Sequence, residues 1–171
     1  MKVLSTRLLG ISMLIAGAAI STGMLAQDSG NRQTVEWSAD GSTMDISGEL
    51  RTWKLSRNVR ITQDSIIING DEATLEYEVN SGELTRVTVH GNPVEYHQQL
   101  SESQEEVTGN SDTIVFFTDE LGESVVELTG NASIESPNFT MRCQSITYLS
   151  DQDIIRETVG PCSGALSRQG N

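Results

Sequence analysis

Few side chains in this sequence could serve as nucleophiles, general bases or metal ligands. His90 and His97 are the only histidines, and their separation of seven positions would place them on opposite faces of a regular strand. No GxSxG, HExxH or CxxC motif occurs. Acidic residues that could pair as acid and base, or bind calcium, are Glu95, Glu105, Glu106, Asp119 and Glu120. Carboxylates also keep strand edges soluble, which is the role that we expect for these residues. We therefore predict no enzymatic activity, no metal site and no cofactor.

The two cysteines, Cys143 and Cys162, lie on either side of a predicted turn at residues 150–153. A hairpin about this turn would bring them near each other, although strict pairing places Cys143 opposite a residue near Val159. A disulfide would suit an oxidising compartment and would stabilise the fold by about 3 kcal/mol. The sequence leaves a bonded pair and two free thiols both open.

The first 26 residues have the pattern of a secretory signal peptide. Lys2 and Arg7 precede an apolar run at residues 8–20, and small residues follow. Because this run of 13 residues is short for a membrane span, we expect a cleaved signal and export rather than an anchor. Removal of residues 1–26 takes the net charge from −13 to −15. That acidic excess argues against a nucleic acid as a partner.

Two short phrases recur along the chain. One starts with Asn and then alternates apolar residues with spacers, and it occurs at residues 58–61, 92–96 and 131–134. The other is a hydroxyl residue, an aliphatic residue, a spacer and an aromatic ring, and it occurs at residues 74–77, 113–116 and 145–148. The asparagines are 34 and 39 positions apart and the rings 39 and 32, which is the spacing of a degenerate repeat. Each phrase alternates, so each predicts a strand with one apolar face.

The remaining sequence also predicts strands, because turn signals recur every eight to twelve residues and no window beyond residue 26 has helical spacing. Asn69-Gly70 predicts a hairpin, since both residues tolerate positive φ. Gly91-Asn92-Pro93 predicts a bulge or corner, since proline cannot donate to a ladder. The fold class is therefore all-β.

The predicted domain covers residues 34–159. Its first strand, at residues 34–38, and its last, at residues 154–159, would be open edges. Residues 160–171 are rich in Gly and Ser and are predicted to form a flexible C-terminal tail.

Four segments are specific when taken together in their order and spacing: NVRITQ at residues 58–63, GNPVEY at 91–96, LTGNA at 128–132 and ITY at 146–148. Because of these four segments, residues 35–156 resemble the LptA/OstA family of periplasmic lipopolysaccharide-transport proteins. The resemblance implies a V-shaped β-jelly roll of about sixteen stacked antiparallel strands. It also implies an interior that holds the lipid A acyl chains of lipopolysaccharide. An inner-membrane partner, LptC, and an outer-membrane partner, LptD, are implied as well.

Acyl-contacting positions of the family correspond here to Val35, Tyr96, Phe116 and Thr118, and Thr118 stands where the family usually has an apolar residue. Strand alternation and the repeated phrases extend the set. The predicted lipid-binding residues are Val35, Leu75, Tyr77, Val94, Tyr96, Ile114, Phe116, Thr118, Ile146 and Tyr148. Each would also suit an ordinary protein core.

We therefore predict a periplasmic bridge protein that carries lipopolysaccharide from the inner to the outer membrane in an apolar trough. Its edge strands would join LptC-like and LptD-like partners, or further copies head to tail. Two alternatives stay open. One is a membrane-anchored, LptC-like component of the same pathway, and the other is a structural or sugar-binding β-solenoid without a lipid trough.

Overall fold

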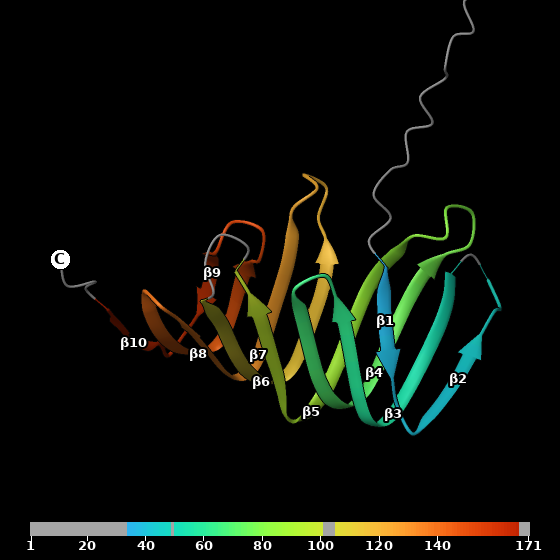
Figure 1. Ribbon diagram of the computed structural model, residues 1–171, viewed down its shortest axis with the longest axis horizontal. Coiled ribbons are helices and arrows are strands. Elements are labelled where there is room, and N and C mark those ends of the chain that lie inside the picture. The colour runs from blue at the N-terminus through green and yellow to red at the C-terminus, as the bar shows by residue number, and fades with distance from the viewer. Residues whose placement is uncertain (1–33, 49, 101–104, 168–171) are drawn as a thin grey trace, which may run out of the picture. The chain divides into compact units, whose positions relative to one another are not determined.

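The computed structural model describes residues 34–48, 50–100 and 105–167 (Figure 1). These residues form ten strands and no helix, so the predicted all-β fold is confirmed, and none of them forms a helix long and apolar enough to span a membrane. The predicted signal peptide lies outside the described residues. The strands are β1 (Val35–Ser38), β2 (Gly41–Asp45), β3 (Leu50–Gln63), β4 (Ile66–Glu78), β5 (Leu84–Gln99), β6 (Glu106–Thr118), β7 (Ser124–Ser136), β8 (Phe139–Leu149), β9 (Ile154–Val159) and β10 (Ser163–Leu166).

One antiparallel sheet contains all ten strands. From β3 to β8, each strand pairs with the next one along the chain. The short strands β1 and β2 both pair with β3, and β9 and β10 both pair with β8. Figure 1 shows β1 and β2 on one side of the sheet and β9 and β10 on the other. The two predicted edges are therefore the two ends of this sheet.

Each long strand is bent at one point, and the bends of neighbouring strands are aligned. The pairing register shifts after Ser56 in β3, after His90 in β5 and after Thr129 in β7. The intervening strands shift opposite these positions. We call the aligned bends the corner, because the sheet folds over there and its two halves face each other.

The corner divides the sheet into two leaves. Leaf 1 comprises β1, β10 and residues 59–63, 66–69, 94–99, 106–110, 132–136 and 139–143. Leaf 2 comprises β2, β9 and residues 50–56, 72–78, 84–90, 113–118, 124–129 and 145–149. Among the described residues there are thus sixteen straight segments. That number agrees with the V-shaped β-jelly roll implied by the sequence.

The corner explains the repeated asparagines. Asn58 and Asn131 both have a φ of 50°, a left-handed conformation that asparagine adopts more readily than most residues. The Asn58 amide donates to Asp40, between β1 and β2, at 2.7 Å, and the Asn131 amide donates to Asp112, in β6, at 3.1 Å. Asn92 lies at the register shift of β5, which confirms the corner predicted there. The Asn-initiated phrase is therefore the sequence signal of the corner.

The predicted hairpin at Asn69 and Gly70 is wrong, because both residues lie inside β4, at its corner. The hairpin turn before β4 contains Asp64, whose φ is 51°. A Cβ atom on Gly70 would lie 2.9 Å from the carbonyl oxygen of His90. Glycine is needed here for the close approach of β5, and not for a turn.

Residues 163–166 form a strand and not the flexible tail that their composition predicted. β9 pairs with the leaf 2 half of β8, the chain crosses the corner, and β10 pairs with the leaf 1 half. A disulfide joins Cys162, at this crossing, to Cys143 in β8. Composition gave no sign of the backbone hydrogen bonds to β8 that order this segment. Residues 168–171 of the predicted tail lie outside the described residues.

Candidate functional site

The space between the leaves is lined by the apolar faces that strand alternation predicted. Nine of the ten predicted lipid-binding residues lie in or against one hydrophobic cluster there. Thr118 differs, since it is exposed at the end of β6. Phe116 is 6% exposed, and Val35 and Tyr77 are half-buried. The fully buried members are Leu75, Val94, Tyr96, Ile114, Ile146 and Tyr148.

The central part of this interior is filled by the protein's own side chains. The ring of Tyr96 in leaf 1 meets the ring of Tyr148 in leaf 2 edge to face, with 6.3 Å between centroids. Near the other end, Trp37 and Trp53 make the same kind of contact at 5.1 Å. Side chains packed in this way leave no room for a hydrocarbon chain. A ligand can reach the fully buried residues only where the leaves move apart.

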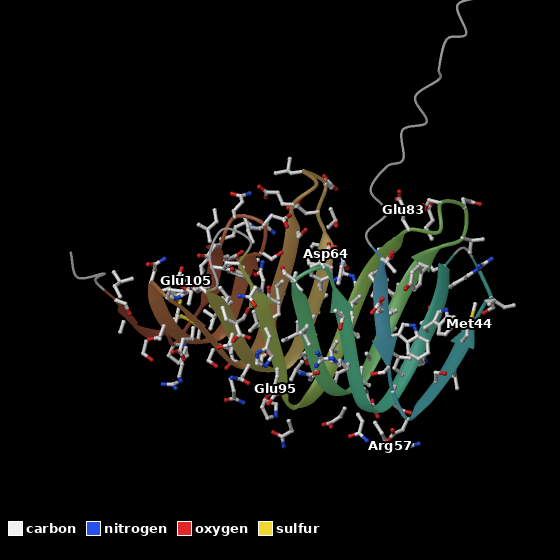
Figure 2. All side chains as sticks on the ribbon, in the orientation of Figure 1. Met44, Arg57, Asp64, Glu83, Glu95 and Glu105 are labelled. Atoms are coloured by element: carbon white, nitrogen blue, oxygen red, sulfur yellow. A yellow bond between two sulfur atoms is a disulfide. The ribbon has the colours of Figure 1, made fainter. Side chains whose placement is uncertain are left out.

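A cavity of about 800 Å³ lies between the tips of the two leaves, opposite the corner. We call this cavity the mouth. It is lined by Gln63, Asp64, Ser65, Ile66, Gln98, Leu100, Glu105, Phe116, Ser124, Ser150, Asp151, Gln152 and Asp153. Figure 2 shows Asp64 and Glu83, which belong to turns at the leaf tips, on the upper side of the sheet, and the corner residue Arg57 on the lower side. Four carboxylates make the mouth acidic, and Phe116 connects it to the apolar interior.

A second hollow, of about 590 Å³, lies at the C-terminal end of the sheet. Its apolar lining comes from both leaves: Phe139, Met141, Ala165 and Leu166 in leaf 1, and Ile154 and Ile155 in leaf 2. We call it the C-terminal hollow. Small-molecule sites commonly have volumes of about 300–1,000 Å³, so a hydrocarbon chain would fit here without any movement of the core.

Exposed large hydrophobic residues gather at both ends of the sheet. Met44, Ile46 and Leu50 are exposed on β2, just after it and at the start of β3. Figure 2 shows Met44 beside β2, at the N-terminal end. At the C-terminal end, Ile154, Val159 and Leu166 are exposed on β9 and β10, and Leu166 is 87% accessible. Because terminal strands also carry unpaired backbone groups, both ends are suited to strand addition.

One buried polar side chain, Gln98, bridges the two leaves beside the mouth. Its Oε1 accepts a hydrogen bond from the Tyr96 hydroxyl at 2.7 Å, and its Nε2 donates to the Ser150 carbonyl oxygen at 2.9 Å. The Tyr148 hydroxyl donates to Asp153 Oδ1 at 2.9 Å. Burial raises the pKa of both tyrosines, and Asp153 adds to the rise for Tyr148, so both phenols stay protonated donors near neutral pH.

Gln98 is not among the residues predicted from the sequence, because the stretch from His97 onward is polar. A signal was available, since Gln98 continues the inward alternation of Val94 and Tyr96. Its buried position in β5 follows from that parity.

Four of the titratable candidates from the sequence make surface pairings: His90, His97, Glu106 and Asp119. His97 Nδ1 lies 3.0 Å from Glu106, and His90 lies 3.0 Å from a threonine hydroxyl. Arg156 donates to Asp119 at 2.7 Å, and this bond lowers the pKa of the Asp119 carboxyl. Within residues 34–48, 50–100 and 105–167, no three His, Cys, Asp or Glu side chains are placed to hold a metal ion.

Comparison with known proteins places this architecture among lipopolysaccharide-transport proteins. The family model described as "LptA/(LptD N-terminal domain) LPS transport protein" matches residues 31–154. The lipopolysaccharide export system protein LptA of Haemophilus influenzae is 28% identical over 149 residues, which cover 86% of this chain and 81% of that protein. LptA of Escherichia coli K12 is 23% identical over 146 residues, covering 84% and 76%. The crystal structure of LptH, the LptA homologue of Pseudomonas aeruginosa, superposes with a TM-score of 0.66 at 19% identity, covering 80% of this chain and 96% of that one, which shows a shared fold.

Proposed function

Because the chain belongs to the LptA/(LptD N-terminal domain) family of LPS transport proteins, we propose that it is a periplasmic bridge protein that carries lipopolysaccharide between the two membranes. Its relatives in H. influenzae and E. coli are named as lipopolysaccharide export proteins. LptH is described as a periplasmic component of a lipopolysaccharide transport device. Carriage of this kind needs an apolar binding site and no catalytic group.

The observation that carries the proposal is the apolar interior between the leaves, which ends in the C-terminal hollow. An acyl chain gains about 0.8 kcal/mol for each methylene that it buries. Chains inserted between the leaves would contact the ten predicted residues. The first contacts would be with the half-buried Val35 and Tyr77, the exposed Thr118, and Phe116 at the mouth, and the remaining buried residues would follow. The buried residues come into contact as the leaves separate.

The charged part of lipid A stays outside in this arrangement. The net charge of −13 and the acidic mouth disfavour its phosphates inside the protein. We infer that the phosphates face solvent or are bridged to carboxylates by divalent cations. A Debye length of about 8 Å confines the repulsion to close contacts, so the negative charge of the protein does not prevent binding through the acyl chains. Loading with and without a chelator, over a range of salt concentrations, measures this contribution. Strong weakening by salt alone would contradict binding through acyl chains.

The two ends of the sheet are the proposed sites of assembly. An edge strand of an LptC-like partner would extend the sheet at one end, and one of an LptD-like partner at the other, so that the trough continues between proteins. Copies of this chain could join in the same way. Such head-to-tail contacts are heterologous and do not close, so the chain would form concentration-dependent oligomers. Leu166→Asp, on an exposed side chain, should weaken such association in analytical ultracentrifugation without changing the fold.

We propose that residues 1–26 are a signal peptide that is cleaved during export, before the β-domain. Amino-terminal sequencing of the exported protein tests this proposal. An intact Met1 would support the anchored, LptC-like alternative.

Site-specific photo-crosslinking to lipopolysaccharide tests the proposed function directly. A photoreactive phenylalanine at Phe116, which faces the interior and the mouth, should form adducts. The matched control is Phe117, the next residue, which has opposite parity and packs under the Arg86 guanidinium at 4.7 Å on the outer face. Labelling at both positions, or at neither, would contradict an acyl site between the leaves.

A further inference from the structure

We propose that Gln98 is the gate residue of the trough: its side chain holds the two leaves together beside the mouth, and acyl chains enter the interior after this bridge opens. The inference rests on the proposed function, and it adds a specific residue that controls access. It would apply to any ligand with hydrocarbon chains that passes through the mouth.

The bridge joins parts of the fold that are not neighbours in the sheet. Gln98 is in β5, whereas Ser150 follows β8, 52 residues later and three strands away. The hydrogen bond between them is therefore a contact of one leaf with the other, and no ladder requires it. Ser150 is itself held in leaf 2, because its backbone N–H donates to Ser124 at 3.0 Å.

Gln98 also stands at the boundary between the two parts of the interior. It lines the mouth together with Ser150, and its other hydrogen bond is to Tyr96, a member of the packed centre. Tyr96 in turn meets the ring of Tyr148 across the interior. Gln98 therefore lies on the path of a chain that moves from the mouth toward this contact.

The hydrogen bonds of the bridge are weak enough to break when the leaves separate. Gln98 is 7% exposed, so its two hydrogen bonds replace lost contacts with water. Once the leaves separate, water at the mouth can satisfy the amide and the Ser150 carbonyl. A neutral hydrogen bond of this kind shifts the equilibrium between closed and open leaves by about three- to tenfold. The bridge therefore biases the leaves toward the closed arrangement without preventing opening.

The test is Gln98→Met, which keeps the length and bulk of the side chain and removes both hydrogen bonds. Binding of fluorescently labelled lipopolysaccharide is followed by stopped flow. We expect the association rate to rise about three- to tenfold, the dissociation rate to stay unchanged and Kd to fall by the same factor. The dissociation rate stays constant because the bridge is already open in the bound protein. Gln99→Met, on the exposed neighbouring position, is the matched control and should behave as wild type.

Two further measurements keep the gate and the proposed function separable. Nile red, a neutral apolar dye, reports opening of the interior without lipopolysaccharide, and Gln98→Met should bind it faster by the same factor. Gln98→Asn, whose amide is one methylene too short to bridge the leaves, replaces the Met variant if that one folds poorly. An association rate that is unchanged for both ligands, or that rises together with dissociation, overturns the gate. Wild-type protein that takes up Nile red but no lipopolysaccharide overturns the proposed function and not the gate.

Discussion

Removal of the disulfide between Cys143 and Cys162 should destabilise the C-terminal end of the trough by an amount that can be calculated. The bond closes a loop of 19 residues, for which the chain-entropy relation gives about 3 kcal/mol. A domain of this size has a total stability of about 5–15 kcal/mol, so the loss is a substantial part. At about 3–4 °C for each kcal/mol, the melting temperature should fall by about 10 °C.

The double variant Cys143→Ala, Cys162→Ala is the appropriate perturbation, because it leaves no free thiol. β10 has no buried side chain and is four residues long, so without the bond it should detach from β8 before the rest of the sheet unfolds. Guanidinium denaturation gives the change in the free energy of unfolding, and amide hydrogen exchange locates it. Protection should be lost in β9 and β10 and kept in β4 to β7.

Reduction of the wild-type protein by dithiothreitol should reproduce the effect, whereas the double variant should not respond to dithiothreitol. A loss below about 1 kcal/mol, together with unchanged protection of β10, would refute the reasoning. Backbone pairing with β8 alone would then be enough to hold the last bent strand.

Three other substitutions test the core, the corner and the surface. Leu75→Ala, at a fully buried position between the leaves, should lower the free energy of unfolding by about 2–5 kcal/mol in guanidinium. Gly130→Ala, at a φ of 79° where a Cβ would collide with Asp112, should cost more than the 1–2 kcal/mol or so of an unobstructed left-handed residue. Asp119→Asn should reduce the loss of unfolding free energy that the protein shows as the pH falls into the acid range. The Arg156 bond lowers the folded pKa of Asp119, so its contribution is present above about pH 4 and is lost as the pH falls through the folded value.

Each of these substitutions has a control nearby. Glu76→Ala, next to Leu75 but on the outer face, should change stability little. Gly82→Ala has a φ of 69° with no atom within 4 Å of the added carbon, so it isolates the backbone cost from the collision at Gly130. Glu120→Gln, on the exposed side chain next to Asp119, should leave the stability in the acid range unchanged. Equal effects in a variant and its control would remove the structural explanation for that site.

Local pattern alone was enough to predict the strands, their inward faces and one corner. Alternation places Ile114 and Phe116 on one face, and likewise Ile146 and Tyr148, because successive residues of a strand point to opposite sides. Pro93 indicated an interruption in β5, because it lacks a backbone donor. These properties depend on residues that are close in sequence, so the sequence by itself determined them.

Only the tertiary structure decided which parts of the chain meet across the interior. Asn69-Gly70 is a corner and not a hairpin, because β5 approaches the glycine too closely for a side chain. The Cys143–Cys162 bond, the filled centre around Tyr96 and the bridge from Gln98 to Ser150 all join segments on different bent strands. These contacts depend on the angle between the two leaves at the corner. That angle results from the packing of both leaves against each other, so no local stretch of sequence determines it.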